Sequence, residues 1–270
     1  RSSDLMFYGC EHLQYIDVSN FKVEKVESFQ DFVAECYQLT SLDVSKFVTT
    51  SAKNMYEMFS NCGNLLVLNL EKFDTSEVTD MSSMFFGCQN LTLLDVRSFD
   101  TKKVENMAGM FQTCNKLTSL DVSHFETPSV TNMAMMFMSL EKVEELNVAN
   151  FNTENVDDMY QMFAYCKSVK SLPVSSFSTK SCTDISEMFM HCESLTSINV
   201  ANFETATIGD MNKLFDGCNN LQIITGLEKF TSEEVRDISY MFRDCRSLHS
   251  ITFGPEFTVY EAMSMDQVFS

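Results

Sequence analysis

A period of 26 residues runs through this sequence and constrains its fold more than any other feature. The stretch FDTSEVTDMSSMFFGCQNLTLLDV, from Phe73 to Val96, recurs in variant form along nearly the whole chain. The Phe position before each Cys advances by 26 residues in eight steps and by 27 residues in the last two. Such a constant period is typical of a solenoid, in which each repeat is one coil that buries its apolar face against its neighbours. We therefore expect a single repeat domain of about ten coils over residues 1–270.

A short helix is predicted in the first half of each coil. Met81, Met84, Phe85 and Cys88 place apolar groups at positions i, i+3, i+4 and i+7, which is the pattern of one helix face. Asp80 precedes them, and its side chain is of the kind that caps the start of a helix. A helix of two turns is marginal alone, so we expect it to depend on burial in the stack.

A short strand is predicted after the Cys of each coil. Leu94 and Val96 are apolar and flank Asp95, an alternation that is typical of a strand with one buried face. Strands at the same place in successive coils must stack in parallel, about 4.8 Å apart. The expected fold class is therefore an α/β solenoid, with a parallel β-sheet on one face and short helices on the other.

The repeat resembles a known family. The pattern F-D-T-S-x-V-T-x-M-x-x-M-F-x-x-C-x-x-L-x-x-L-D-V-S, clearest between Phe73 and Ser123, is similar to the BspA-type leucine-rich repeats of bacterial and protist surface proteins. The resemblance covers essentially the whole chain and departs from the pattern at residues 21–33 and near Gly226 and Gly254. It implies a right-handed coil in an extracellular, cell-surface module without enzymatic activity. The chain starts and stops within a repeat, and we interpret it as a fragment of a longer surface protein.

Charge and hydropathy exclude several classes of partner. Asp and Glu number 38 against 19 Lys and Arg, which gives a formal net charge of −19. Such a surface repels nucleic acid and anionic membranes. No run of about 18 apolar residues occurs, so no membrane span is expected. A basic partner, a neutral carbohydrate and a divalent cation remain open, and exposed strand edges at both ends predict end-to-end self-association.

The repeated Cys, Met and Thr residues are assigned to packing and turns. Nine of the ten Cys share one column, in which Leu140 replaces a Cys. We therefore predict that the side chains of this column occupy apolar cavities. Equivalent side chains one coil apart are too distant for an unstrained disulfide, and no C-x-x-C spacing suggests a metal site. We expect buried, reduced thiols, with disulfides and a metal as the alternatives. Most Met residues match the inward face of the predicted helix, and the Thr column fits turns.

The outward positions of the strands form the candidate ligand surface. Most of them are Asp, Asn or Ser, which fits a solvated polar face, a ligand-binding face or, less well, a calcium site. Val67 and Leu93 are the one apolar pair on this face, so a contact patch is predicted around them. The candidate ligand-binding residues are Val67, Asn69, Leu93, Asp95, Arg97 and Asp121.

The sequence contains no constellation that points to catalysis. The four His residues fall in four different columns, and no phosphate loop or H-E-x-x-H motif occurs. No cofactor is expected. The predicted function is a non-enzymatic cell-surface interaction or adhesion module that binds a protein or glycan, host matrix included, through its sheet face. The alternatives are a structural spacer with no ligand of its own and a self-assembling repeat array.

Overall fold

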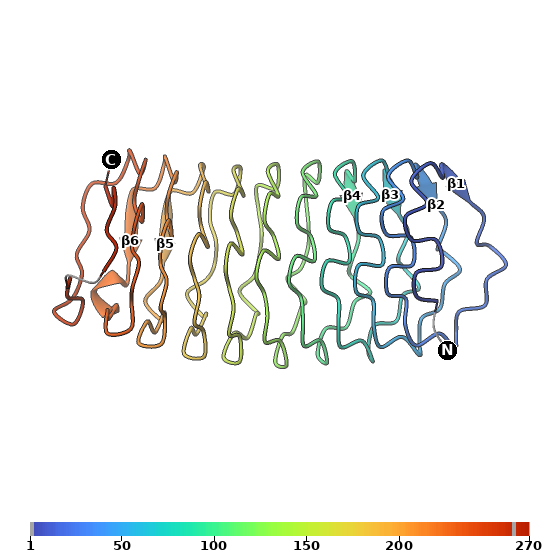
Figure 1. The fold of residues 1–270 in the computed structure, drawn as a ribbon, viewed down its shortest axis with the longest axis horizontal. Helices are drawn as coiled ribbons and strands as arrows, with labels where there is room; N and C mark the ends of the chain where they lie inside the picture. The colour runs from blue at the N-terminus through green and yellow to red at the C-terminus, as the bar shows by residue number, and fades with distance from the viewer. Residues whose placement is uncertain (1–2, 261–262, 270) are drawn as a thin grey trace.

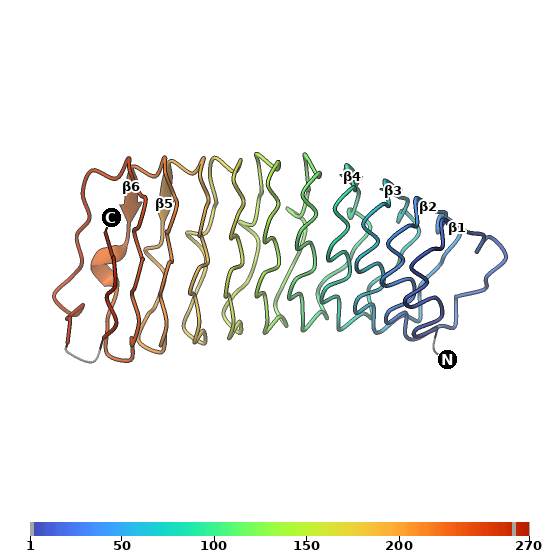
Figure 2. The same ribbon diagram turned by 45° about the horizontal axis from the view of Figure 1, so that its top comes forward.

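The computed structural model describes residues 3–260 and 263–269 and shows an elongated solenoid. The coils lie side by side along one axis, and the two ends of the chain lie at opposite ends of the stack (Figure 1). The view in Figure 2 shows the same order of coils from a second direction. The five remaining residues, at positions 1–2, 261–262 and 270, belong to the predicted repeat domain but lie outside the described residues. The predicted solenoid is confirmed.

Short parallel strands occupy the same place in their coils, as the alternation of apolar and polar residues predicts. The three pairs are parallel, β1 with β2, β3 with β4, and β5 with β6, and each residue pairs with its counterpart in the next coil. Within β4, Leu93 is exposed and Leu94 is buried, so the inward side chain packs on the core. The strands are β1 (Tyr15–Ile16), β2 (Ser41–Leu42), β3 (Val67–Leu68), β4 (Leu93–Leu94), β5 (Ser197–Asn199) and β6 (Ile223–Thr225).

The predicted short helices are wrong. Among the described residues the only helical segment is a 3-10 turn, η1 (Leu227–Lys229), and the segment from Met81 to Cys88 is a series of turns. The backbone is left-handed at Ser83 (φ 53°) and Gly87 (φ 71°), which breaks an α-helix. The equivalent segments of the other coils also carry left-handed residues. None of the described residues forms a helix long and apolar enough to cross a membrane.

Hydrogen bonds between coils replace the bonds that a helix would make. The N–H groups of Met81, Ser83 and Phe85 donate to carbonyls of the next coil at 3.1, 2.8 and 3.0 Å. Between them, Met84 N–H donates to the Met81 carbonyl at 3.2 Å and closes a tight turn. We call this region, residues 80–88 and their counterparts, the turn side. Its backbone groups are paired without a helix, because every second residue is bonded across the stack.

The Asp80 column caps a turn instead of a helix. The Asp80 carboxylate accepts the N–H of Ser82 at 2.8 Å, and the Asn106 side chain accepts the N–H of Ala108 at 3.0 Å. The backbones of these positions pair in parallel from Ser28 through every coil to Ser264. An Asp or Asn at this place therefore stabilises a local turn and joins a continuous ladder along the turn side.

The core consists of stacked columns of like residues. The rings of Phe59, Phe85 and Phe111 stack nearly parallel, with centroids 5.6 and 5.8 Å apart. The Cys column is buried except at its ends, and Cys88 Sγ donates to the Phe59 carbonyl at 3.1 Å. Burial raises the pKa of the Cys114 thiol to about 12, so the protonated thiol is the stable form.

The Thr column joins coils as well as forming a turn. The buried Thr75 hydroxyl donates to the Asp100 carbonyl at 2.9 Å and accepts the Asp100 N–H at 2.8 Å. The same pair of bonds links Thr101 to Glu126 in the next coil. Each hydroxyl therefore satisfies a donor and an acceptor of the neighbouring coil, which the sequence pattern alone did not predict.

Candidate interaction surface on the strand face

The outward side chains of the strand segments form one face of the solenoid, which we call the strand face. Val67 and Leu93 are direct partners in the register of β3 and β4, and 57% and 58% of their surfaces are exposed. Leu66, which the sequence analysis did not single out, is 52% exposed beside them. These three aliphatic residues, Leu66, Val67 and Leu93, form an apolar shelf across two adjacent coils.

The polar candidate residues follow the shelf along their own coils. The side chains of Asn69, Asp95 and Asp121 each accept the backbone N–H two residues later, at 3.1, 3.0 and 3.1 Å. Each one therefore closes a turn at the end of its strand segment. A signal for this role was present in the sequence, because either Asp or Asn occupies this column in most coils and both provide the same acceptor oxygen.

Arg97 folds back on Asp95. Its guanidinium Nε and Nη2 donate to the two carboxylate oxygens at 2.9 and 2.5 Å. The guanidinium and the Arg97 backbone N–H lower the pKa of Asp95 to about 2. The Ser123 hydroxyl and backbone N–H lower the pKa of Asp121. Both carboxyl groups are therefore ionised at neutral pH, but only Asp95 has a basic partner within hydrogen-bond distance.

Backbone pairing on the strand face is interrupted between β2 and β3 and again, over a longer stretch, after β4. No backbone hydrogen bond joins residues 92–97 to residues 118–123, or residues 118–123 to residues 144–149, in the part of the chain that the structure describes. Pairing resumes in full only at β5 and β6. On the turn side the ladder is unbroken through the same coils. In these coils the backbone hydrogen bonds between neighbours therefore lie on the turn side and not on the strand face.

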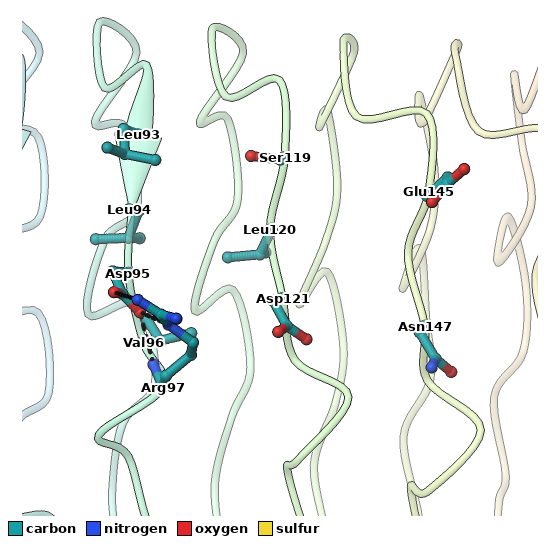
Figure 3. Close-up of a pocket in the computed structure, with 10 residues that line it drawn as sticks. All are labelled: Leu93, Leu94, Asp95, Val96, Arg97, Ser119, Leu120, Asp121, Glu145 and Asn147. Carbon is teal, nitrogen blue, oxygen red and sulfur yellow. Dashed lines mark hydrogen bonds and ion pairs between the residues drawn. The ribbon is translucent and has the colours of Figure 1, made fainter.

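A groove of about 550 Å³ lies where the pairing stops. Figure 3 shows side chains from three successive coils around it, with Leu93, Ser119 and Glu145 at one level and Asp95, Asp121 and Asn147 at the next. Its residues are Leu93, Leu94, Asp95, Val96, Arg97, Ser119, Leu120, Asp121, Glu145 and Asn147.

The structure brings four of the six predicted residues to this groove, namely Leu93, Asp95, Arg97 and Asp121. Val67 adjoins it through the shelf, and Asn69 lies on the same coil as Val67. The sequence analysis missed Ser119, Glu145 and Asn147 as site residues. Glu145 carried the one usable signal, because it is the acidic residue in a strand-face column that otherwise holds Tyr, Ser, Val, Leu and Ile.

Comparison with known proteins identifies a repeat family. Residues 2–92, 61–172, 87–198 and 169–270 match the family described as "Mycoplasma protein of unknown function, DUF285". No curated protein matches the sequence.

Solved structures of bacterial leucine-rich repeat proteins are similar in shape. A leucine rich cell surface protein from Faecalibacterium prausnitzii shares 15% identity with a TM-score of 0.42, over 90% of this chain and 69% of that one. A leucine-rich repeat protein from Eubacterium ventriosum shares 13% identity with a TM-score of 0.37, over 91% and 84% of the two chains. A leucine-rich repeat protein from T. pallidum shares 17% identity with a TM-score of 0.35, over 72% and 69%.

Proposed function

The chain belongs to the DUF285 family, and from this premise and the strand-face groove we propose that it is a non-enzymatic interaction module that binds a protein or glycan. The observation that carries the proposal is the shelf of Leu66, Val67 and Leu93, more than half exposed, beside a groove of about 550 Å³. A cell-surface location is part of this proposal and rests on the resemblance of its repeats to those of surface proteins.

The shelf differs from the rest of the strand face because two exposed apolar residues of adjacent strands are direct partners there, whereas Tyr15 and Ile223 each pair with a Ser. Single exposed apolar residues are normal, whereas a contiguous apolar patch next to a groove is typical of an interaction site. The remaining strand face supports a second candidate function, a spacer without a ligand, because Ser41, Ser171 and Ser197 keep the column of Val67 polar in other coils. The two functions differ in whether the shelf is needed for anything beyond stability.

A binding screen with matched variants separates the two functions. The probes are an immobilised glycan array and a panel of purified extracellular-matrix proteins, tested with the unaltered chain and with the double variant Val67→Ser, Leu93→Ser. Removing two aliphatic contacts should weaken binding at least about tenfold, since each buried side chain contributes about 1.5–3 kcal/mol. The unfolding temperature should change little, because both side chains are already exposed.

Ile223→Ser is the control for this screen. Ile223 occupies the same coil position in β6 and is also 57% exposed, but it lies outside the shelf and the groove. Binding that survives in this control and is lost in the double variant supports the interaction module. Absence of binding to every probe, or equal loss in both variants, favours the spacer.

A further inference from the structure

We propose that the groove binds an extended protein segment that presents an aliphatic or aromatic side chain and, two or four residues away, a Lys or Arg. This inference rests on the proposed function and specifies the partner of the same surface. It follows from the charge of the groove, its apolar floor and the distance between its carboxylates and the shelf.

The rim of the groove carries two carboxylates that make no ion pair, although Arg97 and His124 act on Asp121, and Lys170 on Glu145, through longer-range charge. Arg97 is bound to Asp95, and the nearby Lys170 is bound to Glu144 at 2.6 Å. Within the described part of the chain, Asp121 and Glu145 form no ion pair, although both line the groove. A ligand that covers them must supply positive charge, because burying an unpaired carboxylate is costly.

The floor of the groove is apolar. Leu94 and Leu120 form part of it, and each is nearly buried in its own coil. Lys and Arg side chains lay their methylene stems on apolar surface while the charged head remains at a polar rim. A basic side chain therefore matches both parts of the groove: its stem lies on Leu94 and Leu120, and its head reaches Asp121 and Glu145.

The second anchor is set by the spacing of the coils. Asp121 and Glu145 lie between one and three coils beyond Leu93 and Val67, which corresponds to roughly 5–14 Å at about 4.8 Å per coil. An extended peptide covers such distances in about two to four residues, and side chains two or four positions apart point to the same side. A peptide that runs along the stack thus places its apolar side chain on the shelf and its basic side chain in the groove.

A neutral glycan fits these features less well. Its hydroxyl groups would leave Asp121 and Glu145 desolvated without an opposite charge, and an anionic glycan would be repelled. The excess of acidic residues in the whole chain, −19 in formal charge, adds a long-range attraction for a basic protein segment.

Selection from a phage library of random dodecapeptides tests the proposal on the whole chain. Enriched peptides should carry Lys or Arg two or four residues from an aliphatic or aromatic residue. Each is then synthesised with a fluorophore, and its affinity is measured by anisotropy beside a version in which norleucine replaces the Lys or citrulline the Arg. The uncharged version should bind about tenfold more weakly, and raising NaCl from about 50 to 500 mM should weaken the parent peptide about fivefold.

The matched protein variants are Asp121→Asn with Glu145→Gln, and as the control Asp17→Asn with Asp43→Asn. Asn keeps the turn-closing oxygen, as Asn69 and Asn147 do in the same column. Asp17 and Asp43 close equivalent turns in coils away from the groove. The first pair should reduce peptide affinity about tenfold, and the second less than about twofold.

Four outcomes overturn the inference. Enrichment of peptides without a basic residue contradicts it, and so does equal binding of the peptides by the unaltered chain and the Asp121→Asn, Glu145→Gln variant. In both cases the proposed function stands if the double variant Val67→Ser, Leu93→Ser still abolishes binding. Binding on the glycan array with no enriched peptide excludes a peptide partner but keeps the interaction module. Failure of both screens removes the inference and the proposed function together.

Discussion

At the scale of single residues, backbone conformation in this molecule is dictated by contact between coils. Gly226 adopts a left-handed φ of 103°, and a Cβ built on it would lie 2.3 Å from the backbone nitrogen of Ala201 in the preceding coil. Gly209 has no atom within 4 Å of the equivalent position. Gly226 is therefore required at the corner that admits the extra residue of this coil, whereas Gly209 is not.

We predict that Gly226→Ala destabilises the solenoid by about 3 kcal/mol or more, because the methyl group collides with backbone that cannot move aside. Gly209→Ala should be neutral or stabilise by up to about 1 kcal/mol, since it restricts only the unfolded chain. Urea unfolding followed by circular dichroism measures both. Equal effects of the two substitutions would contradict the close packing of successive coils at Gly226.

At the scale of elements, the sequence predicted which side chains are buried better than it predicted the backbone that carries them. Met81, Met84, Phe85 and Cys88 are all fully buried, as the helical spacing predicts. The same spacing also fits a series of turns, because residues with left-handed φ bring the chain back to the core at similar intervals. The ambiguity arises because hydrogen bonds to the next coil, which decide the backbone, leave no mark in the pattern of a single repeat.

Only some residues of the candidate site could be predicted, again because contacts between coils are not visible in a single repeat. Val67 and Leu93 could be identified because an apolar residue at an outward strand position departs from the repeat. Ser119 and Asn147 could not, because they are typical of their columns and matter only where strand pairing stops. That interruption depends on how neighbouring coils pack, and no single residue encodes it.

The Asp residues of the turn-side ladder predict a pH-dependent stability. Asp158, Asp184 and Asp210 pair in adjacent coils. Burial, and then the charges of Asp184 and Asp157, raise the pKa of Asp158 above 3.8. The folded state therefore binds the proton of the Asp158 carboxyl group more tightly than the unfolded chain does. The stability contributed by this protonation is complete below pH 3.8 and is lost as the pH rises through the raised pKa.

Asp158→Asn should consequently raise the free energy of unfolding at pH 7 by on the order of 0.5 kcal/mol, the size expected for removing a like-charge pair between neighbouring strands. The turn is kept, because Asn132 accepts the equivalent N–H in the preceding coil at 2.9 Å. The gain should vanish near pH 3, where the native Asp is protonated. Asn132→Asp, which places a further carboxylate beside Asp158 in the ladder, should lower the free energy of unfolding at pH 7. An effect of either substitution that does not depend on pH would refute like-charge repulsion as its cause.

At the scale of the whole molecule, the two sides of the solenoid differ in how they are held together. The ladder on the turn side runs through every coil from Ser28 to Ser264, whereas in the described residues the strand face is unpaired between β2 and β3 and over the longer stretch from β4 to the coil of Glu145. Stability in such a stack is the sum of contacts between neighbours. We therefore expect local opening to be easiest at the strand face of the coils that form the groove.

Hydrogen exchange measured residue by residue should show this difference directly. The amides of Met81, Ser83 and Phe85 donate across the stack and should exchange at least about a hundredfold more slowly than those of Ser119 and Glu145. A peptide bound in the groove should slow exchange at Ser119 and Glu145 and leave the turn side unchanged. Uniform protection around the coil would show that the strand face is paired in solution.

The 26-residue length that most coils share has a consequence for how such a protein can change over generations. Every coil offers its neighbour the same donors and acceptors along the turn side, so one coil can be joined to any other in phase. In-frame recombination between repeats of the gene can therefore add or remove whole coils without creating a new kind of junction. The groove would keep its shape while its distance from either end of the protein is altered. The length of the solenoid and the binding specificity of the groove can therefore evolve independently.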